Sequence, residues 1–245
     1  IFISHLHGDH YLGLMGMLWS MELLGRKKSI SIAAPKGLEE LIQLHLKLAS
    51  ASLGFELEIR SLEDAADIPV YKDKNMTVHA FGQNHRIPCF GFSFTEPPKP
   101  RNLIKDKIEN LGLPVNKIRA LKAGQDVKTD KGRLIKAIDV SSEPKLSKRY
   151  VFCTDTLPQK LPESAENADL LYHEATYDHS LADKAEARFH STSIQAAEVA
   201  LESTAKKLII GHFSSRYRDN EPMLSEAQRI FPSTISAKDG LTIPI

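Results

Sequence analysis

The sequence predicts an α/β domain, and three features of the chain indicate this class. Short apolar runs typical of buried strands alternate with helical patterns along the 245 residues. Three of these runs end at or near a histidine or an aspartate: Tyr150–Cys153 before Asp155, Leu170–Tyr172 before His173 and Leu208–Ile210 before His212. The chain is 42% hydrophobic, which is enough for one substantial core. We therefore expect a single layered domain over residues 1–245.

Further elements are expected in the first part of the chain. Residues 11–25 are apolar on almost every side, which predicts a helix that is buried all round. Ser29–Ala34 is predicted as a strand, and Pro35 is predicted to begin a helix that continues to Leu48, because proline favours the first helical turn. The remaining expected elements are strands at Phe55–Leu62, Met76–Phe81 and Phe90–Phe94 and a helix at Ser193–Ser203.

One segment of the chain is strongly basic. A proline-rich run at residues 96–100 breaks regular structure, and an insert over residues 97–148 follows. Residues 99–149 hold fourteen Lys and Arg against six Asp and Glu, a local net charge of +8, whereas the whole chain carries only +1. Such a segment is typical of a contact with phosphates, although charge alone fits a solvated loop equally well.

Composition also bounds the location of the protein. The sequence has no run of about eighteen apolar residues, so we expect no transmembrane helix and no membrane partner. No signal peptide is visible at the first residues. Both cysteines, Cys89 and Cys153, lie in apolar runs and are predicted to be reduced core residues. These features favour a cytoplasmic protein.

The first ten residues contain the highest concentration of possible metal ligands in the chain. A short apolar strand leads into His5, His7, Asp9 and His10. In an extended segment His5 and His7 point to the same side, and Gly8 then permits a turn that carries Asp9 and His10 to a second point. Imidazole and carboxylate are the ligands of Zn²⁺ at catalytic centres. The spacing therefore predicts two partly built metal sites.

This stretch resembles the His-x-His-x-Asp-His signature of the metallo-β-lactamase superfamily. The resemblance implies a four-layer αββα sandwich and two Zn²⁺ ions per subunit. Its third histidine, bridging aspartate and last histidine match His85, Asp155 and His212, which all follow apolar strands. The implied ligand sets are His5, His7 and His85 for one ion, Asp9, His10 and His212 for the other, and Asp155 for both.

Three later motifs narrow the resemblance to the ribonuclease Z family. They are His173-Glu174-Ala175-Thr176, His190-Ser191-Thr192 and His212-Phe213-Ser214-Ser215-Arg216-Tyr217. By this resemblance His173 assists protonation of the leaving oxygen with Glu174 in support, although the pair also fits a purely orienting role. Asp9 is expected to orient or deprotonate the attacking water. His190, Ser191 and Thr192 are expected to contact substrate.

The resemblance also gives the basic insert a role. Ribonuclease Z carries an arm between its third histidine and its bridging aspartate that grips the tRNA elbow, and residues 97–148 occupy this interval. The expected phosphate contacts are Lys99, Arg101, Lys105, Lys107, Lys117, Arg119 and Lys122. The family fold also supplies strands before the first metal motif, and we expect this chain to lack them.

The implied function is that of a zinc-dependent endoribonuclease. It would remove 3′ extensions from precursor tRNA by hydroxide attack on the phosphodiester, leave a 3′-hydroxyl and act as a homodimer. Two alternatives stay open. One is another hydrolase of the superfamily that acts on a small phosphodiester or thioester, and the other is a catalytically inactive RNA-binding relative.

Overall fold

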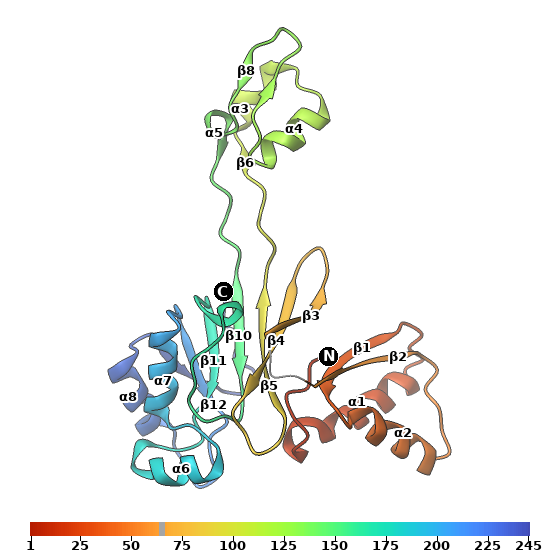
Figure 1. The fold of residues 1–245 in the computed structure, drawn as a ribbon, viewed down its shortest axis with the longest axis vertical. Helices are drawn as coiled ribbons and strands as arrows, with labels where there is room; N and C mark the ends of the chain where they lie inside the picture. The colour runs from red at the N-terminus through yellow and green to blue at the C-terminus, as the bar shows by residue number, and fades with distance from the viewer. Residues whose placement is uncertain (64–66) are drawn as a thin grey trace. The chain divides into compact units, whose positions relative to one another are not determined.

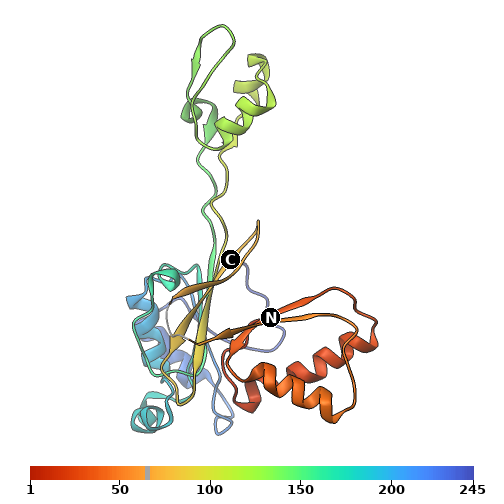
Figure 2. The same cartoon turned by 45° about the vertical axis from the view of Figure 1, so that its right-hand side comes forward.

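The structure is a computed structural model that describes residues 1–63 and 67–245. It contains two compact units, which are drawn in Figures 1 and 2. The first unit, which we call the body, comprises Ile1–Thr95 and Arg149–Ile245. The second, which we call the insert, comprises Glu96–Lys148.

A mixed sheet of seven strands forms the centre of the body. Its order is β13-β12-β11-β10-β5-β4-β3. The strands are β3 (Ile68–Lys72), β4 (Thr77–Gln83), β5 (Cys89–Thr95), β10 (Arg149–Cys153), β11 (Leu170–Glu174), β12 (Leu208–Gly211) and β13 (Thr234–Ser236). Strands β10 to β13 are parallel, whereas β3, β4, β5 and β10 pair antiparallel. The carboxyl ends of β10, β11 and β12 therefore lie at one edge of the sheet, and the residues that follow these strands lie there too.

Helices cover the parallel half of this sheet. They are α6 (Ala182–Arg188), α7 (Ser193–Glu202) and α8 (Glu221–Ile230), and α7 packs against β11, β12 and α8. The core between them includes Val151, Leu171, Ala196 and Leu208, all of which are fully or almost fully buried. These alternating strands and helices confirm the predicted α/β class.

A smaller layer is built from the first part of the chain. Strands β1 (Ile30–Pro35) and β2 (Leu57–Leu62) pair in parallel as a separate two-stranded sheet. Helices α1 (Gly8–Leu23) and α2 (Leu38–Leu48) lie on the same side of this sheet in Figure 1. Ile3 joins β1 through a hydrogen bond from its N–H to the Ala33 carbonyl at 2.9 Å. This bond anchors the segment that leads into the first histidines.

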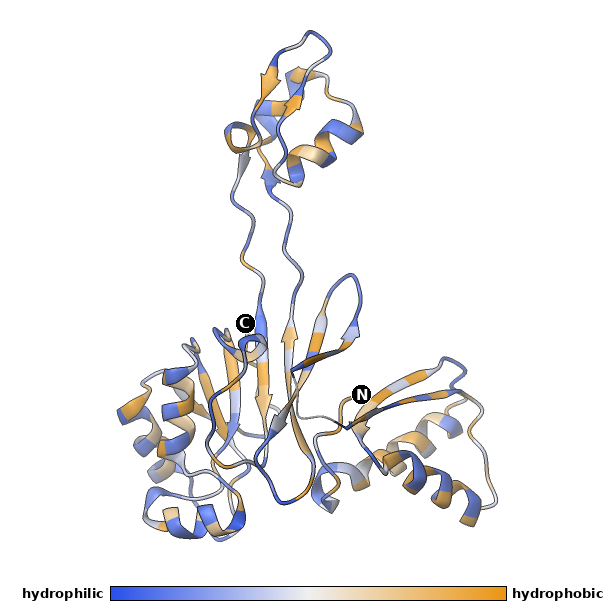
Figure 3. Cartoon of the chain, viewed as in Figure 1, coloured by the Kyte–Doolittle hydropathy of each residue, from blue (hydrophilic) through white to orange (hydrophobic). Residues whose placement is uncertain are grey.

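The expectation for residues 11–25 was wrong in one respect. A helix forms there, but only Leu14 and Leu18 are buried, whereas Leu12 is 61% and Leu23 is 85% exposed. The reason is geometric, because the helix packs one face against β1 and α2 and no described residue covers the other face. Figure 3 shows hydrophobic (orange) and hydrophilic (blue) residues interspersed along α1 and α2.

Two other element boundaries differ from the expectation. Pro35 closes strand β1, paired with Leu62, and does not begin the following helix. The chain turns at Gly37, whose left-handed φ of 100° lets helix α2 start only at Leu38. Strand β3 was not predicted, and it contains Pro69, a residue that is disfavoured in the interior of a sheet. The strand lies at the edge of the sheet, where proline is tolerated, and its register shifts beside Pro69.

The insert has short elements and a core of its own. Its helices are α3 (Lys105–Ile108), η1 (Glu109–Leu111), α4 (Val115–Lys122) and α5 (Ala137–Val140). Two small ribbons pair β6 (Asn102–Leu103) with β9 (Ser141–Ser142) and β7 (Val127–Lys128) with β8 (Leu134–Ile135). The core residues are Leu121, Val127, Ile135, Ala137 and Val140.

Both cysteines behave as predicted, since Cys89 and Cys153 are buried free thiols. Among the helices that the structure describes, none is long and apolar enough to cross a membrane.

Candidate metal centre and active site

The first histidine motif lies where the strand-like start of the chain meets helix α1. His5 is fully buried, and its Nε2 is 3.1 Å from Nδ1 of His7. His7 is the N-cap of α1, so Asp9 and His10 fall in the first helical turn. The start of helix α1 at Gly8, rather than a separate turn there, carries Asp9 and His10 away from His5 and His7.

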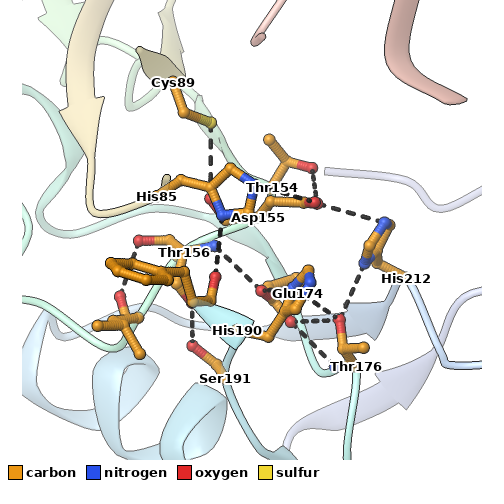
Figure 4. Close-up of polar contacts among 12 residues, drawn as sticks. His85, Cys89, Thr154, Asp155, Thr156, Glu174, Thr176, His190, Ser191 and His212 are labelled. Atoms are coloured by element: carbon orange, nitrogen blue, oxygen red, sulfur yellow. Dashed lines mark hydrogen bonds and ion pairs between the residues drawn. The ribbon is translucent and has the colours of Figure 1, made fainter. Parts of the chain in front are cut away.

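The other three predicted ligands reach the same place from the edge of the large sheet. His85 lies in the loop between β4 and β5, Asp155 follows β10 and His212 follows β12. His212 has a left-handed φ of 59°, an uncommon conformation for a residue other than glycine. Such strain is often held at functional positions. The structure thus brings all seven predicted ligands together, and Figure 4 shows three of them.

Asp155 lies at the centre of the cluster. Its Oδ2 is 3.6 Å from Nε2 of His5 and 3.8 Å from Nε2 of His85. Its Oδ1 is 3.4 Å from Nε2 of His10 and 3.2 Å from Nε2 of His212. Each oxygen of this one carboxylate therefore faces a different group of imidazoles, which is the arrangement that a bridging ligand requires.

The cluster favours unprotonated imidazoles. Burial lowers the pKa of His5 to about 3, and the neighbouring His10 adds to this effect. Burial likewise lowers the pKa values of His10 and His85. Burial of Asp155 opposes its charge, but His212, His10 and His5 outweigh this cost and lower its pKa. Neutral imidazole and ionised carboxylate are the forms that bind metal ions.

A hydrogen-bonded frame around Glu174 supports one side of the cluster. The buried Glu174 carboxylate accepts hydrogen bonds from the N–H of Thr156 at 3.0 Å, the N–H of Thr176 at 2.9 Å and the Thr176 hydroxyl at 2.6 Å. The Thr176 oxygen also lies 2.9 Å from Nδ1 of His212. Because the hydroxyl hydrogen points to Glu174, Nδ1–H of His212 donates to it, which leaves Nε2 of His212 bare toward Asp155.

His190 completes this frame (Figure 4). Its Nδ1 donates a hydrogen bond to Oε1 of Glu174 at 2.8 Å. One ring nitrogen of His190 lies within 4.8 Å of ligand atoms of both Asp155 and His212. Burial opposes protonation of His190, but the hydrogen bond and charge of Glu174 outweigh burial and raise its pKa. Unlike His5, His10 and His85, this imidazole is therefore suited to hold a proton.

The role expected for His173 needs correction. His173 has no exposed surface, and its Nδ1 donates to the backbone carbonyl of Glu174 at 2.7 Å. Its Nε2 is buried without a hydrogen-bond partner in the described part of the chain. Burial also lowers its pKa. An imidazole in this position cannot deliver a proton to a substrate, whereas His190 lies at the cluster and is paired with Glu174.

Ser191 and Thr192 also differ from the expectation of substrate contact. Both are fully buried. The Ser191 hydroxyl donates to the carbonyl of Thr156 at 2.7 Å, and Thr192 caps helix α7 in a reciprocal pair with Gln195. The two residues therefore fix the loop that carries His190. Thr156 was not predicted as a site residue, because its only signal in the sequence is its place directly after Asp155.

Most of the cations singled out in the insert are already engaged. Arg101 donates to both carboxylate oxygens of Glu143 and to the Ser141 hydroxyl, and its side chain is only 17% exposed. The others pair as Lys99 with Glu96, Lys105 with Glu109, Lys107 with the Asp139 carbonyl and Lys117 with Asp130. Arg119 and Lys122 are exposed on α4 and have no ion pair with any described residue.

No family model matches the chain. Curated relatives do match along its whole length. Ribonuclease Z of Bacteroides fragilis strain YCH46 is 39% identical over 246 residues, which cover 100% of this chain and 81% of that protein. Ribonuclease Z of Synechocystis sp. strain PCC 6803 is 40% identical over 252 residues, which cover 100% of this chain and 77% of that protein. The chain belongs to the ribonuclease Z family.

Solved structures agree with this membership. The short form of human tRNase Z has a TM-score of 0.66 and 26% identity, over 100% of this chain and 79% of that chain. The metallo-β-lactamase fold protein YhfI from Bacillus subtilis has a TM-score of 0.61 over 98% of this chain and 75% of that chain. At 16% identity this second likeness concerns the fold alone. The metallo-β-lactamase fold that the sequence predicts is therefore confirmed.

Proposed function

We propose that this member of the ribonuclease Z family is a zinc-dependent endoribonuclease that removes 3′ extensions from precursor tRNA and leaves a 3′-hydroxyl. One observation carries the proposal. Five imidazoles and the Asp9 carboxylate converge around Asp155, which offers one oxygen to each of two ligand groups. Three of those imidazoles have lowered pKa values, as metal ligands require.

The residues fit a pair of divalent cations. Nε2 of His10 is buried without a hydrogen-bond partner among the described residues, and it faces carboxylate oxygens of Asp9 and Asp155 at 3.3 and 3.4 Å. A divalent cation between this nitrogen and the two carboxylates would give all three groups a partner. We propose His5, His7, His85 and Asp155 as one zinc site, and Asp9, His10, His212 and Asp155 as the other.

Asp9 is proposed to assist activation of the attacking water. A pair of bound zinc ions supplies an activated water at neutral pH and positive charge beside the attacked phosphate. Asp9 lies at the open side of the cluster with a side chain that is 68% exposed. Its burial opposes charge, but the adjacent His10 and its own backbone N–H lower its pKa, so the carboxylate stays ionised and able to accept a proton from the attacking water.

His190 is proposed to protonate the departing 3′ oxygen of the tRNA. Glu174 holds Nδ1 of His190 at 2.8 Å and stabilises the protonated ring. Thr156 and Thr176 in turn fix the Glu174 carboxylate. The roles first assigned to His173 and Glu174 are thus revised, with His190 as the proton donor and Glu174 as the residue that orients it.

The insert is proposed to bind the tRNA through its phosphates. Arg119 and Lys122 carry this part of the proposal, because both are exposed on α4 and neither has an ion pair among the described residues. Lys105 can join them, since its contact with Glu109 spans 3.9 Å and both side chains are mostly exposed. Arg101 is instead proposed to hold the base of the insert together.

The family resemblance also supports a homodimer in the cytoplasm, and the apolar face of α1 and α2 is where we propose that two copies meet. Leu41, Leu44 and Leu48 are 39%, 53% and 77% exposed and recur at the spacing of one helix face. Leu12 and Leu23 are exposed on α1. A row of exposed leucines is typical of an interaction surface.

Cleavage of an end-labelled, 3′-extended precursor tRNA by zinc-loaded protein tests the function. We expect one cut at the end of the acceptor stem, with Asp9→Ala at least about 100-fold slower because it removes a proton acceptor and a proposed ligand. A folded, zinc-loaded protein that cleaves only a small phosphodiester or thioester would instead support the alternative hydrolase. Binding of tRNA without any metal-dependent turnover would support the inactive relative.

A further inference from the structure

One of the proposed ligands is held from a distant segment of the chain. His85 lies between β4 and β5, yet its Nδ1 is 3.0 Å from the backbone carbonyl oxygen of Phe189, which follows helix α6. A carbonyl only accepts hydrogen bonds, so Nδ1 carries the hydrogen. Nε2 is then bare, and it lies 3.2 Å from Nδ1 of His7 and 3.8 Å from Oδ2 of Asp155.

Phe189 achieves this contact through an unusual backbone conformation. It is the C-cap of α6 and has a left-handed φ of 60°. Glycine is the usual residue at such a helix end, because a side chain disfavours the left-handed region. The conformation closes the helix with hydrogen bonds from Phe189 N–H to Glu186 at 3.0 Å and from His190 N–H to Ala185 at 2.9 Å.

A second contact joins the same two segments. The guanidinium of Arg86, the neighbour of His85, lies 6.0 Å from the centre of the Phe189 ring. A cation at this distance from an aromatic face is attracted to it, though weakly at an exposed site. The ring therefore adds only a weak attraction between the two segments.

We propose that Phe189 is a positioning residue whose left-handed backbone aims its carbonyl at His85 and fixes that ring in the tautomer a metal ligand needs. This inference rests on the proposed metal centre and extends it. The next residue, His190, donates to Glu174, so one turn of chain orients both a ligand and the proton donor. A carbonyl that holds the second ring nitrogen of a metal-binding histidine commonly strengthens the metal site.

Four substitutions at Phe189 separate the backbone role from packing by the ring. Phe189→Gly and Phe189→Asn remove the ring but accept the left-handed conformation, whereas Phe189→Ala and Phe189→Val remove the ring and disfavour it. We would measure zinc affinity by competition with a chromophoric chelator, and kcat and KM for precursor tRNA. We expect Phe189→Val to weaken the tighter zinc site by about tenfold or more, and Phe189→Gly to stay within about threefold of wild type.

The kinetic result should follow the same order. KM for tRNA is expected to stay near the wild-type value in all four variants, because the insert supplies the tRNA contacts, while kcat falls in the alanine and valine variants. Lys184→Gln is the matched control. Lys184 is also on α6 and its cation lies 5.9 Å from the ring of Tyr177, but it makes no contact with His85. It should leave zinc affinity unchanged.

Each outcome decides the proposal. Equal zinc affinities in the glycine and alanine variants, or a weaker site in the glycine variant, would show that the ring acts by packing and overturn it. If Phe189→Val does not fold by circular dichroism, the glycine and alanine pair decides alone. Wild-type protein that binds no zinc would instead refute the proposed metal centre itself, and with it this inference.

Discussion

Nδ1 of His190 lies 2.8 Å from Oε1 of Glu174, and this contact distinguishes His190 from the other imidazoles of the cluster. Burial lowers the pKa values of His5, His10 and His85. Burial also opposes protonation of His190, but the hydrogen bond and charge of Glu174 raise its pKa. The site thus combines histidines with lowered pKa values and one with a raised pKa, a separation that suits them to different chemical tasks.

The first prediction concerns this pair. His190→Ala should slow cleavage of precursor tRNA by about 100-fold or more, because a general acid commonly contributes this much. A substrate with sulfur in place of the bridging 3′ oxygen needs no protonation, so the variant should cleave it at nearly the wild-type rate. His179→Ala, which changes an exposed histidine, is the control. Equal slowing of His190→Ala on both substrates would argue against proton donation by His190.

Metal removal should destabilise the folded protein. A ligand present at about 100 times its Kd stabilises the native state by about 2.7 kcal/mol, which corresponds to roughly 5–11 °C in melting temperature for a chain of this size. We therefore expect chelation to lower the wild-type melting temperature. Asp155→Asn should have a lowered melting temperature that chelator does not change further. Asp73→Asn, in an exposed turn, should lose as much melting temperature on chelation as the wild type. If the melting temperature of the wild-type protein is the same with and without chelator, the metal assignment is contradicted.

The insert offers a prediction about salt dependence. Arg119→Gln and Lys122→Gln should each weaken tRNA binding and reduce the slope of log affinity against log salt by about one, as expected for a lost phosphate contact. Arg101→Gln should act differently, because Arg101 binds Glu143 and Ser141 within the insert. It should lower protection of insert amides from hydrogen exchange. Unchanged salt slopes in the Arg119 and Lys122 variants would remove these residues from the tRNA contact.

The exposed leucines are where we propose that two subunits meet. Leu44→Glu should convert a dimer into monomers in sedimentation experiments, because a charge cannot be buried in an apolar interface without a partner. The fold should survive, since the side chain is already 53% exposed in the single chain. Leu201→Glu is the matched control, because Leu201 is 57% exposed on α7. A Leu44→Glu variant that remains dimeric would place the interface elsewhere.

The two cysteines should be unreactive in the native protein. Burial raises the pKa values of the Cys89 and Cys153 thiols far above neutrality. A raised pKa keeps a thiol protonated as the pH increases, and the thiolate is the reactive form. A chromogenic disulfide reagent at pH 8 should therefore detect no thiol before denaturation and two after it. Rapid labelling of the native protein would show that this region opens readily.

The ligand set was predicted from the resemblance to the metallo-β-lactamase superfamily, and three of its members also follow apolar strands. His85, Asp155 and His212 lie just past apolar runs, and the edge of a sheet brings such positions together. The proposed proton donor was harder to predict, because His173 and His190 both lie in short polar motifs. Only the structure shows that His173 is enclosed by the sheet and that His190 lies beside Glu174.

Two other features depend on packing that no local pattern reports. The apolar residues of α1 predict burial, but hydropathy does not say whether another element covers each face. Charge in the insert predicts a phosphate contact, but not that Arg101 and Lys117 are paired with acids brought close by the fold. The carbonyl of Phe189 had no sequence signal at all, since it depends on a backbone angle.

Cleavage in ¹⁸O-labelled water, followed by mass spectrometry of both products, tests the central claim most directly. If the cluster hydrolyses precursor tRNA with the 3′ oxygen as the leaving group, the tRNA should end in an unlabelled 3′-hydroxyl. The released trailer should carry a 5′-phosphate with one ¹⁸O atom. A 2′,3′-cyclic phosphate on the tRNA, or label in its 3′ end, would contradict the account.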